Sequence, residues 1–422
     1  MTTTKNNEHK KLNFSSEREQ SQVCLNSAEH EKNQGRKVLN VPNLRFKEFQ
    51  GEWKKCTLED VINFSTTRVN SSELNKDNYV STENMLQDYQ GIVKAKSVPE
   101  DVNVVSFSCG DILISNIRPY LKKVWKATFN GGCSSDVFVL KANDNIESDY
   151  LHYVIANDKF INFVMSGAKG VKMPRGDKKQ METYSLSLPQ IQEQHKIARL
   201  ISLLDERIAT QNKIIEDLKK LKSAIIEKHY GQAEKLIVYV ADLGESFSVG
   251  NLAKEDLTET GIPCVIYGEL FTTYGETILQ IESHTNKTES MVLSKKGDLL
   301  FPSSTTVDAM SLIAPSVINV DGVILGGDMF GIHINHNYNA QYLSYYFNHI
   351  AKRQLAKYAK GSTIIHLHYA DIKKAKLSLP SLEEQNRMAK CLVILDDKIK
   401  VENSLLNLLN SQKAYLLCQM FI

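Results

Sequence analysis

The chain reads LSLPQIQEQHKIARLISLLDERIATQNKIIEDLKKLKSAI over Leu186–Ile225, and a second version, LSLPSLEEQNRMAKCLVILDDKIKVENSLLNLLNSQKAYL, occupies Leu377–Leu416. The two stretches align without a gap at an offset of 191 residues, and 13 of the 40 aligned pairs are identical. A repeat at this spacing is far longer than a solenoid unit, which has ~20–45 residues. The pattern therefore indicates a tandem duplication in which each copy is a whole domain followed by a helix.

Shorter motifs precede each copy in the same order. Gly110-Asp-Ile-Leu corresponds to Gly297-Asp-Leu-Leu, and Tyr150-Leu-His-Tyr corresponds to Tyr342-Leu-Ser-Tyr. The first part of each unit consists of short apolar runs broken by Gly, Asn, Asp and Ser, which predicts strands and turns, and short helical stretches follow. These patterns predict an α/β (α+β) fold with an internal pseudo-two-fold repeat.

Each LSLP sequence opens a long helix. Pro189 and Pro380 suit the first turn of a helix, where a missing N–H costs nothing. Residues 1–40 are rich in Lys, Glu, Asn, Gln and Ser and too poor in apolar residues to fold alone, so we expect a disordered tail. The predicted parts are the tail (1–40), a first domain (41–188), a central helix (189–231), a second domain (232–379) and a distal helix (380–422).

Apolar residues recur along both helices at alternating spacings of four and three, as in a coiled-coil seam. Polar residues interrupt the seam at the same two steps, Gln211 and Lys222 in one helix and Glu402 and Lys413 in the other. A helix of forty residues is ~60 Å long and cannot bury such a stripe on its own small domain. We therefore expect the helices to pair as an antiparallel coiled coil between the domains; the alternative is that each packs on its own domain. The predicted seam residues are Ile197, Ile201, Leu204, Ile208, Ile215, Leu218, Ile225, Met388, Leu392, Leu395, Ile399, Leu406, Leu409 and Leu416.

Composition and absent motifs exclude several classes of protein. Lys+Arg 51 against Asp+Glu 49 leaves a net charge of +2, which rules out a uniformly basic nucleic-acid coat but not local basic faces. No apolar run approaches the ~18 residues of a membrane span and the start lacks a secretion signal, so we expect a cytoplasmic protein. Walker A, HExxH, GxSxG and GxGxxG sequences are missing, and the cysteines lack zinc spacing, which argues against a catalytic centre or a bound metal.

Basic residues gather at one position of the repeat, just before each LSLP sequence. Residues 159–180 hold six basic residues against one acid, residues 351–376 hold seven against one, and each stretch contains a glycine-centred loop. Such loops suit phosphate contacts through backbone N–H groups and Lys, with Arg or His reading base edges, although a solvated lysine-rich surface is the plain alternative. The candidate DNA-binding residues are Arg118, Lys122, Lys123, Lys169, Lys172, Arg175, Lys178 and Lys179 in the first domain and Ser303, Ser304, Thr305, Thr306, Lys360, Ser362, Thr363, His366, His368, Lys373 and Lys374 in the second.

Taken together, these motifs resemble the specificity subunit of Type I restriction–modification systems. The resemblance is carried by Val41-Pro-Asn-Leu-Arg-Phe-Lys-Glu-Phe-Gln-Gly-Glu-Trp53, by the two Gly-Asp motifs and by the two LSLP helices, and it extends from about residue 41 to the C-terminus. It implies two target-recognition domains that each read one half of a bipartite, asymmetric double-stranded DNA target. It also implies that the paired helices set the spacer between the half-sites and dock two methyltransferase subunits.

The same resemblance places the chemistry in other chains. Methyltransferase partners would bind S-adenosylmethionine and flip out the adenine that they methylate, and restriction subunits would use ATP and Mg. This chain would bind no cofactor and catalyse nothing. The rival interpretations are a duplicated coiled-coil adaptor that binds only proteins and, against the missing motifs, a self-contained nuclease or methylase.

Overall fold

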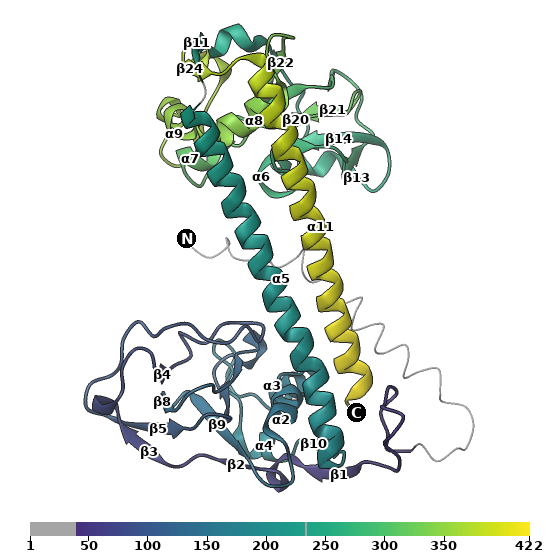
Figure 1. The fold of residues 1–422 in the computed structure, drawn as a ribbon. Helices are drawn as coiled ribbons and strands as arrows, with labels where there is room; N and C mark the ends of the chain where they lie inside the picture. The colour runs from purple at the N-terminus through teal and green to yellow at the C-terminus, as the bar shows by residue number, and fades with distance from the viewer. Residues whose placement is uncertain (1–38, 233) are drawn as a thin grey trace. The chain divides into compact units, whose positions relative to one another are not determined.

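The computed structural model describes residues 39–232 and 234–422, so the predicted tail lies outside the described residues except for its last two positions (Figure 1). Contacts divide the chain into two units. Unit 1 comprises the residues up to Thr210 together with Leu406–Ile422, and unit 2 comprises Gln211–Leu405. Each unit therefore contains one globular domain and a part of both long helices.

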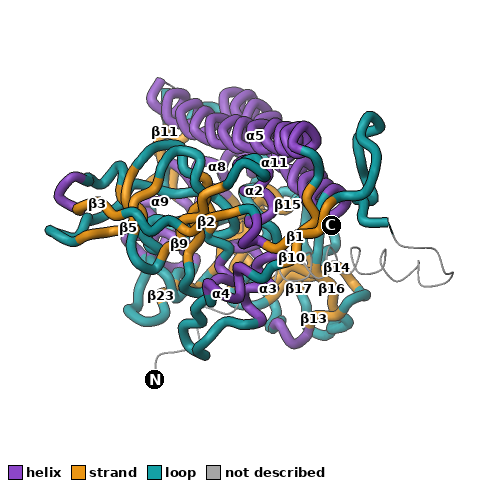
Figure 2. Tube along the Cα trace, turned by 90° about the horizontal axis from the view of Figure 1, so that it is seen from below, coloured by secondary structure: helices purple, strands orange, loops and turns teal. Residues whose placement is uncertain are grey.

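The domain of unit 1 is built from two four-stranded sheets and one strand pair. Figure 2 draws strands in orange and helices in purple. The first sheet has the order β2-β9-β6-β7 and the second the order β3-β5-β8-β4, while β1 pairs with β10. Three short helices lie between β9 and β10 in the sequence. The elements are β1 (Lys54–Thr57), β2 (Ile62–Phe64), β3 (Arg68–Asn70), β4 (Tyr79–Val80), β5 (Asn103–Phe107), β6 (Ile112–Ser115), β7 (Val124–Lys126), β8 (Gly131–Cys133), β9 (Val137–Ala142), α2 (Ser148–Ile155), α3 (Asp158–Ser166), α4 (Lys178–Glu182) and β10 (Ser185–Leu188).

Unit 2 repeats one of these sheets and alters the other. Its first sheet, β12-β22-β18-β20-β15, keeps the order of the first sheet of unit 1 and adds β15, whereas its second sheet has the order β13-β16-β14-β21-β17. The elements are β11 (Leu236–Tyr239), β12 (Gly244–Ser248), β13 (Leu257–Thr258), β14 (Ile262–Ile266), α6 (Glu269–Thr272), β15 (Thr277–Ile278), β16 (Ser283–Thr285), β17 (Val292–Leu293), β18 (Asp298–Pro302), β19 (Ser304–Thr305), α7 (Ala309–Leu312), β20 (Ser316–Ile318), β21 (Ile324–Gly326), β22 (Met329–Ile334), α8 (Ala340–His349), α9 (Lys352–Leu355), β23 (Ile365–His366), α10 (Tyr369–Ile372) and β24 (Lys376–Leu379).

The repeated Gly-Asp motif forms the same turn in both units. Gly110 and Gly297 have φ of 95° and 92°, which glycine adopts without strain. Each following aspartate accepts a hydrogen bond of 2.8 Å from the backbone N–H three residues earlier and so closes the turn into β6 or β18. Both strands are fully buried at the centre of their sheets. The motif is therefore explained by a structural requirement for a tight turn.

The two long helices are α5 (Ile191–Gln232) and α11 (Leu382–Met420) (Figure 1). Both begin two residues after a proline. The prediction that Pro189 and Pro380 lie in the first turn is therefore wrong. The carbonyl of each proline instead accepts a hydrogen bond from the Nε2 of the glutamine five residues later, at 3.0 Å from Gln194 and 2.9 Å from Gln385. Each of these buried glutamines also accepts the backbone N–H of Glu147 or Asn339, just before α2 or α8. A side chain thus ties each helix start to the domain before it.

Within each unit the two long helices pack against each other, and the predicted antiparallel pairing is confirmed. In unit 1 the beginning of α5 packs against the end of α11, and in unit 2 the end of α5 packs against the beginning of α11. All fourteen predicted seam residues are buried or half-buried. Near the end of α5 the seam moves by one position, because Ile226 is buried and Ile225 only half-buried. The polar interruption Gln211 donates through Nε2 to the backbone carbonyl of Glu402 at 3.0 Å.

Neither long helix has the length of apolar sequence that a membrane crossing requires, and the same holds for every other helix in the described part of the chain.

Candidate DNA-recognition surface

The two basic groups predicted in the first domain lie side by side. The segment after β6 pairs with the segment before α4: the Arg118 N–H donates to the Pro174 carbonyl at 2.7 Å, and the Gly176 N–H donates to the Asn116 carbonyl at 2.8 Å. These backbone bonds bring Arg118 next to the stretch from Lys169 to Lys179, and Lys122 and Lys123 follow it after a single short turn. The fold therefore assembles one basic surface from two parts of the sequence.

A short hairpin forms the outer part of this surface. Lys169 and Arg175 exchange two backbone hydrogen bonds of 3.0 and 2.9 Å and enclose a five-residue loop that begins at Gly170 with φ of 95°. In unit 2, Lys360 and His366 exchange equivalent bonds of 2.9 and 2.7 Å around a loop that begins at Gly361 with φ of 115°. We call residues 169–175 basic hairpin 1 and residues 360–366 basic hairpin 2. The two hairpins are the same structure at the same position of the repeat.

Basic hairpin 2 rests on the segment that follows β18, as hairpin 1 rests on the segment that follows β6. Strand β19 pairs with β23 so that Ser304 lies opposite His366, and the Leu367 N–H donates to the Ser303 carbonyl at 2.9 Å. Ser303 and Ser304 are buried by this pairing, Thr305 is half-buried and Thr306 is exposed. The buried serines support the hairpin through their backbone and cannot present their hydroxyls to a duplex, so they leave the set of candidate contacts.

Acidic neighbours hold several of the predicted cations in place. Lys169 pairs with Asp177 at 2.6 Å, and this ion pair lowers the pKa of the aspartate. Arg175 pairs with Asp136 at 2.8 Å. These bonds orient the hairpin and reduce its net charge. Three more of the predicted residues form ion pairs: Lys122 with Asp158 at 3.0 Å, Lys178 with Glu182 at 3.9 Å and Lys360 with Asp371 at 2.5 Å.

The remaining predicted residues divide by exposure. Lys123 is half-buried and donates to the Thr82 carbonyl at 2.5 Å, and burial lowers the pKa of its ammonium group. Its side chain therefore stabilises the fold and is a weak candidate for a DNA contact. His366 and His368 stack with ring centres 6.1 Å apart. Within the described residues no group of three His, Cys, Asp or Glu side chains could hold a metal, which leaves the histidine pair without a third ligand. Predicted residues that are exposed and not yet described are Arg118, Lys172, Lys179, Ser362, Thr363, Lys373 and Lys374.

Apolar side chains stand at the tips of both hairpins, and the sequence reasoning missed them. Val171 and Met173 are 101% and 47% exposed in hairpin 1, and Ile364 is 50% exposed in hairpin 2. An apolar group held in solvent on a loop that carries a cation is suited to contact a thymine methyl group in the major groove. The sequence did contain a signal for these residues. Each is an apolar residue in a basic loop that begins with glycine, and its position fits the periodicity of neither a strand nor a helix.

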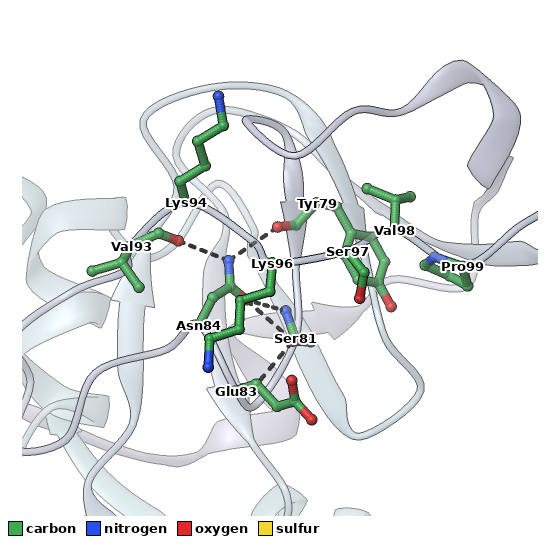
Figure 3. A pocket seen from close by; sticks show the side chains of 10 residues that line it. All are labelled: Tyr79, Ser81, Glu83, Asn84, Val93, Lys94, Lys96, Ser97, Val98 and Pro99. Atoms are coloured by element: carbon green, nitrogen blue, oxygen red, sulfur yellow. Dashed lines mark hydrogen bonds between the residues drawn. The ribbon is translucent and has the colours of Figure 1, made fainter.

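A pocket of about 300 Å³ lies beside β4 in the first domain (Figure 3). Its lining includes Lys94, Lys96, Glu83 and Asn84. The Asn84 amide donates to the Tyr79 and Val93 carbonyls at 3.1 and 2.9 Å, and its oxygen accepts the Ser81 N–H at 2.6 Å. The polar lining therefore holds its own loop together, and we do not include the pocket in the candidate surface.

A second apolar stripe runs along the outer face of α11. Ile394, Val401, Leu408 and Tyr415 follow one another at intervals of seven and are 61%, 61%, 68% and 57% exposed. Leu203, Ile214 and Leu221 give α5 a weaker version of the same stripe, with exposures of 42%, 40% and 48%. We call these residues the outer stripes. Heptad spacing of exposed apolar residues fits packing against a further helix.

The family described as the Type I restriction modification DNA specificity domain matches residues 50–220 and residues 239–411. The chain therefore belongs to this family and carries two copies of its domain, as the resemblance implied. It is the specificity subunit of a Type I restriction–modification system, a subunit without catalysis of its own, since the enzymatic activities belong to partner subunits.

Individual relatives agree with this assignment. The type I restriction enzyme MjaVIII specificity subunit of Methanocaldococcus jannaschii is 27% identical over 299 residues, which cover 64% of this chain and 69% of that protein. The EcoDI specificity subunit of Escherichia coli is 32% identical over 98 residues, 23% of this chain and 22% of that protein. The crystal structure of the S subunit from M. genitalium shares the fold with a TM-score of 0.60 at 16% identity, covering 90% of this chain and 99% of that one.

Proposed function

We propose that each domain reads one half of a bipartite, asymmetric sequence in double-stranded DNA, and that α5 and α11 determine the number of unread base pairs between the halves. Two methyltransferase subunits, which bind S-adenosylmethionine, dock on the long helices, and restriction subunits that use ATP and Mg join the complex. The chain itself needs no cofactor, and its place of work is the cytoplasm. The observation that carries the proposal is the construction of one basic hairpin twice, with different residues at its tip.

The shared stem and the different tips correspond to the two requirements of sequence-specific DNA binding. Cations and backbone N–H groups attract phosphates and fix the position of the protein, but they carry no sequence information. In this proposal the side chains at the tip meet base edges, and the tips differ, with Val-Lys-Met in hairpin 1 and Ser-Thr-Ile in hairpin 2. Two copies of one frame with unlike tips would recognise two different half-sites, which makes the whole target asymmetric.

DNA binding by the complex with its methyltransferase is expected to weaken steeply as salt rises, because cations that contact phosphates release counterions. Lys172→Ala and Lys179→Ala should each reduce the slope of log affinity against log salt by about one unit and weaken binding equally on all sequences. The measurement is fluorescence anisotropy at several salt concentrations. Lys213→Ala, at an exposed lysine on α5, is the matched control and should leave the slope unchanged. A complex that binds no DNA at low salt would favour the adaptor interpretation.

We expect the methyltransferase subunits to dock on the outer stripes of α5 and α11. Val401→Glu with Leu408→Glu places two charges in the α11 stripe, and we expect at least a ~100-fold loss of affinity for the methyltransferase, since two buried apolar contacts of ~1.5–3 kcal/mol each are replaced by desolvated charges. Co-purification and calorimetry measure the effect. Asn407→Glu, on an exposed face of α11 away from the stripe, is the control. Unchanged binding by the double variant would remove the stripe from the interface.

A further inference from the structure

One ion pair of unit 1 joins three elements of the fold. Asp205 on α5 contacts the Lys413 ammonium on α11 at 2.6 Å and accepts a hydrogen bond of 3.0 Å from the Tyr153 hydroxyl on α2. The Lys413 ammonium lies 6.0 Å from the centre of the Tyr153 ring. We call these residues triad 1. The domain, the long helix that follows it and the opposite long helix therefore meet at a single carboxylate.

Unit 2 contains the same arrangement with the roles of the long helices exchanged. Asp396 on α11 contacts the Lys222 ammonium on α5 at 2.7 Å and accepts a hydrogen bond of 2.6 Å from the Tyr345 hydroxyl on α8. We call these residues triad 2. The Lys222 side chain is only 9% exposed and also contacts Glu276 at 2.9 Å, whereas the Lys413 side chain is 27% exposed. Triad 2 is therefore the more buried and the more connected of the two.

A purely apolar seam leaves the helix register undetermined. Leu and Ile recur every seven residues on both helices, so a slip of one heptad would again oppose apolar side chains. Besides Gln211 and Glu402, which bond to each other, Lys222 and Lys413 interrupt the seam, and each has an aspartate opposite it in the observed register. After a slip these partly or fully buried ammonium groups would lose their acids, and an uncompensated buried charge is strongly destabilising. The tyrosine hydroxyls extend the same constraint to the domain.

We propose that Lys222 and Lys413, with Asp396, Asp205 and the two tyrosines, are positioning residues that fix the register of α5 against α11 and the seating of each domain on the helix pair. In doing so they restrict the complex to one spacer length. The inference rests on the proposed function only for the spacer; the register is a property of the chain itself. A slip of one heptad would shift the helices by ~10 Å, close to three base-pair steps of 3.4 Å.

The experiment measures methylation by the full chain in complex with its methyltransferase. The substrate is a DNA library in which the spacer between the two half-sites varies from four base pairs shorter to four base pairs longer than the preferred spacer. We expect Lys222→Met with Lys413→Met to raise relative methylation at non-preferred spacers by about tenfold, with the half-site bases unchanged. Exchanging the charges of triad 1 alone, Lys413→Asp with Asp205→Lys, should keep the single spacer. Triad 2 is left unchanged in this variant because Lys222 also contacts Glu276. Lys219→Met, at an exposed lysine of α5, is the control.

Register is measured separately by cysteine crosslinking in the full chain. Gln211→Cys with Glu402→Cys joins positions that face each other, and Gln211→Cys with Leu395→Cys joins positions that would face after a slip of one heptad. The methionine variants should lower the first crosslink and raise the second. If they do not fold, Lys413→Met alone, which leaves the more buried triad 2 intact, replaces them and should shift both readouts in the same direction by a smaller amount.

The outcomes separate the two ideas. An unmodified complex that methylates no target overturns the proposed function, while the crosslinks still decide the role of the triads in register. Folded variants that keep one spacer and one crosslink overturn the triads as positioning residues and leave the proposed function intact. A change of half-site bases with an unchanged spacer would also overturn the inference.

Discussion

Replacing Gly110–Met181 by the matching segment of another specificity subunit is expected to change one half of the methylated sequence completely and to leave the other half and the spacer as they were. The segment carries basic hairpin 1 together with the stretch around Arg118 on which it rests, so the backbone bonds between Asn116, Arg118, Pro174 and Gly176 move as one piece. Base contacts at well-separated positions contribute independently, at ~1–3 kcal/mol for each mismatched pair. The new half-site should therefore be that of the donor. Sequencing of methylated adenines measures it.

The duplication supplies a matched experiment for this exchange. Gly297–Ile372 is the corresponding segment of unit 2, and replacing it should change only the other half-site. A single exchange that altered both halves would mean that the two domains do not read independently. Retention of the original sequence after the exchange would place the base contacts outside the segment, and the altered second sheet of unit 2 would then be the next candidate.

The fold could be predicted from the sequence where short-range chemistry decides it. Gly110 and Gly297 mark turns that need a positive φ, and the spacing of Ile, Leu and Met on the long helices is enough to predict a seam. The pairing of α5 with α11 followed from length, because a helix of this size has no other apolar surface in reach. These features depend on residues a few positions apart. Because the chain is duplicated, the sequence contains the pattern for each feature twice.

Backbone pairing between segments far apart in the chain could not be predicted from the sequence. The hydrogen bond between Arg118 and Pro174 joins residues that no periodicity connects, and the opposition of Ser304 to His366 has the same character. For this reason the buried serines were grouped with exposed contacts, and the exposed tip residue Val171 was overlooked. The predicted helix starts were two residues too early. The Gln194 and Gln385 side chains donate to the carbonyls of Pro189 and Pro380, and helix propensity does not describe side-chain bonds of this kind.

The asymmetry between the copies falls where reading would take place. The first sheets share one strand order, the Gly-Asp turns share one geometry and the triads share one set of residue types. The second sheets and the hairpin tips differ. A frame that must repeat accurately to hold two domains on a common helix pair tolerates little change, whereas surfaces that contact different bases must diverge. The shared elements therefore fit a structural role, and the second sheets and hairpin tips, which differ between the copies, fit a role in reading DNA.

Inserting one helical turn of four residues after Ile208 of α5 and another after Leu405 of α11 is expected to lengthen the spacer and to leave both half-sites unchanged. Each insertion adds ~6 Å to its helix, close to two base-pair steps of 3.4 Å. Both helices must be extended because they are bound to each other in each unit, through triad 1 and triad 2. An insertion in α5 alone would leave α11 too short to keep both triads. Methylation of a library with randomised spacers measures the outcome.

The single insertions are the controls. Each should lower methylation at every spacer by at least ~10-fold, because one of the buried ammonium groups loses its aspartate or the shorter helix must be strained. The double insertion should recover activity at a spacer about two base pairs longer, since it keeps each triad inside its own unit. If the preferred spacer stayed the same after the double insertion, the paired helices would not determine the separation of the half-sites. A spacer that changed equally with one insertion or two would show that α5 alone controls it.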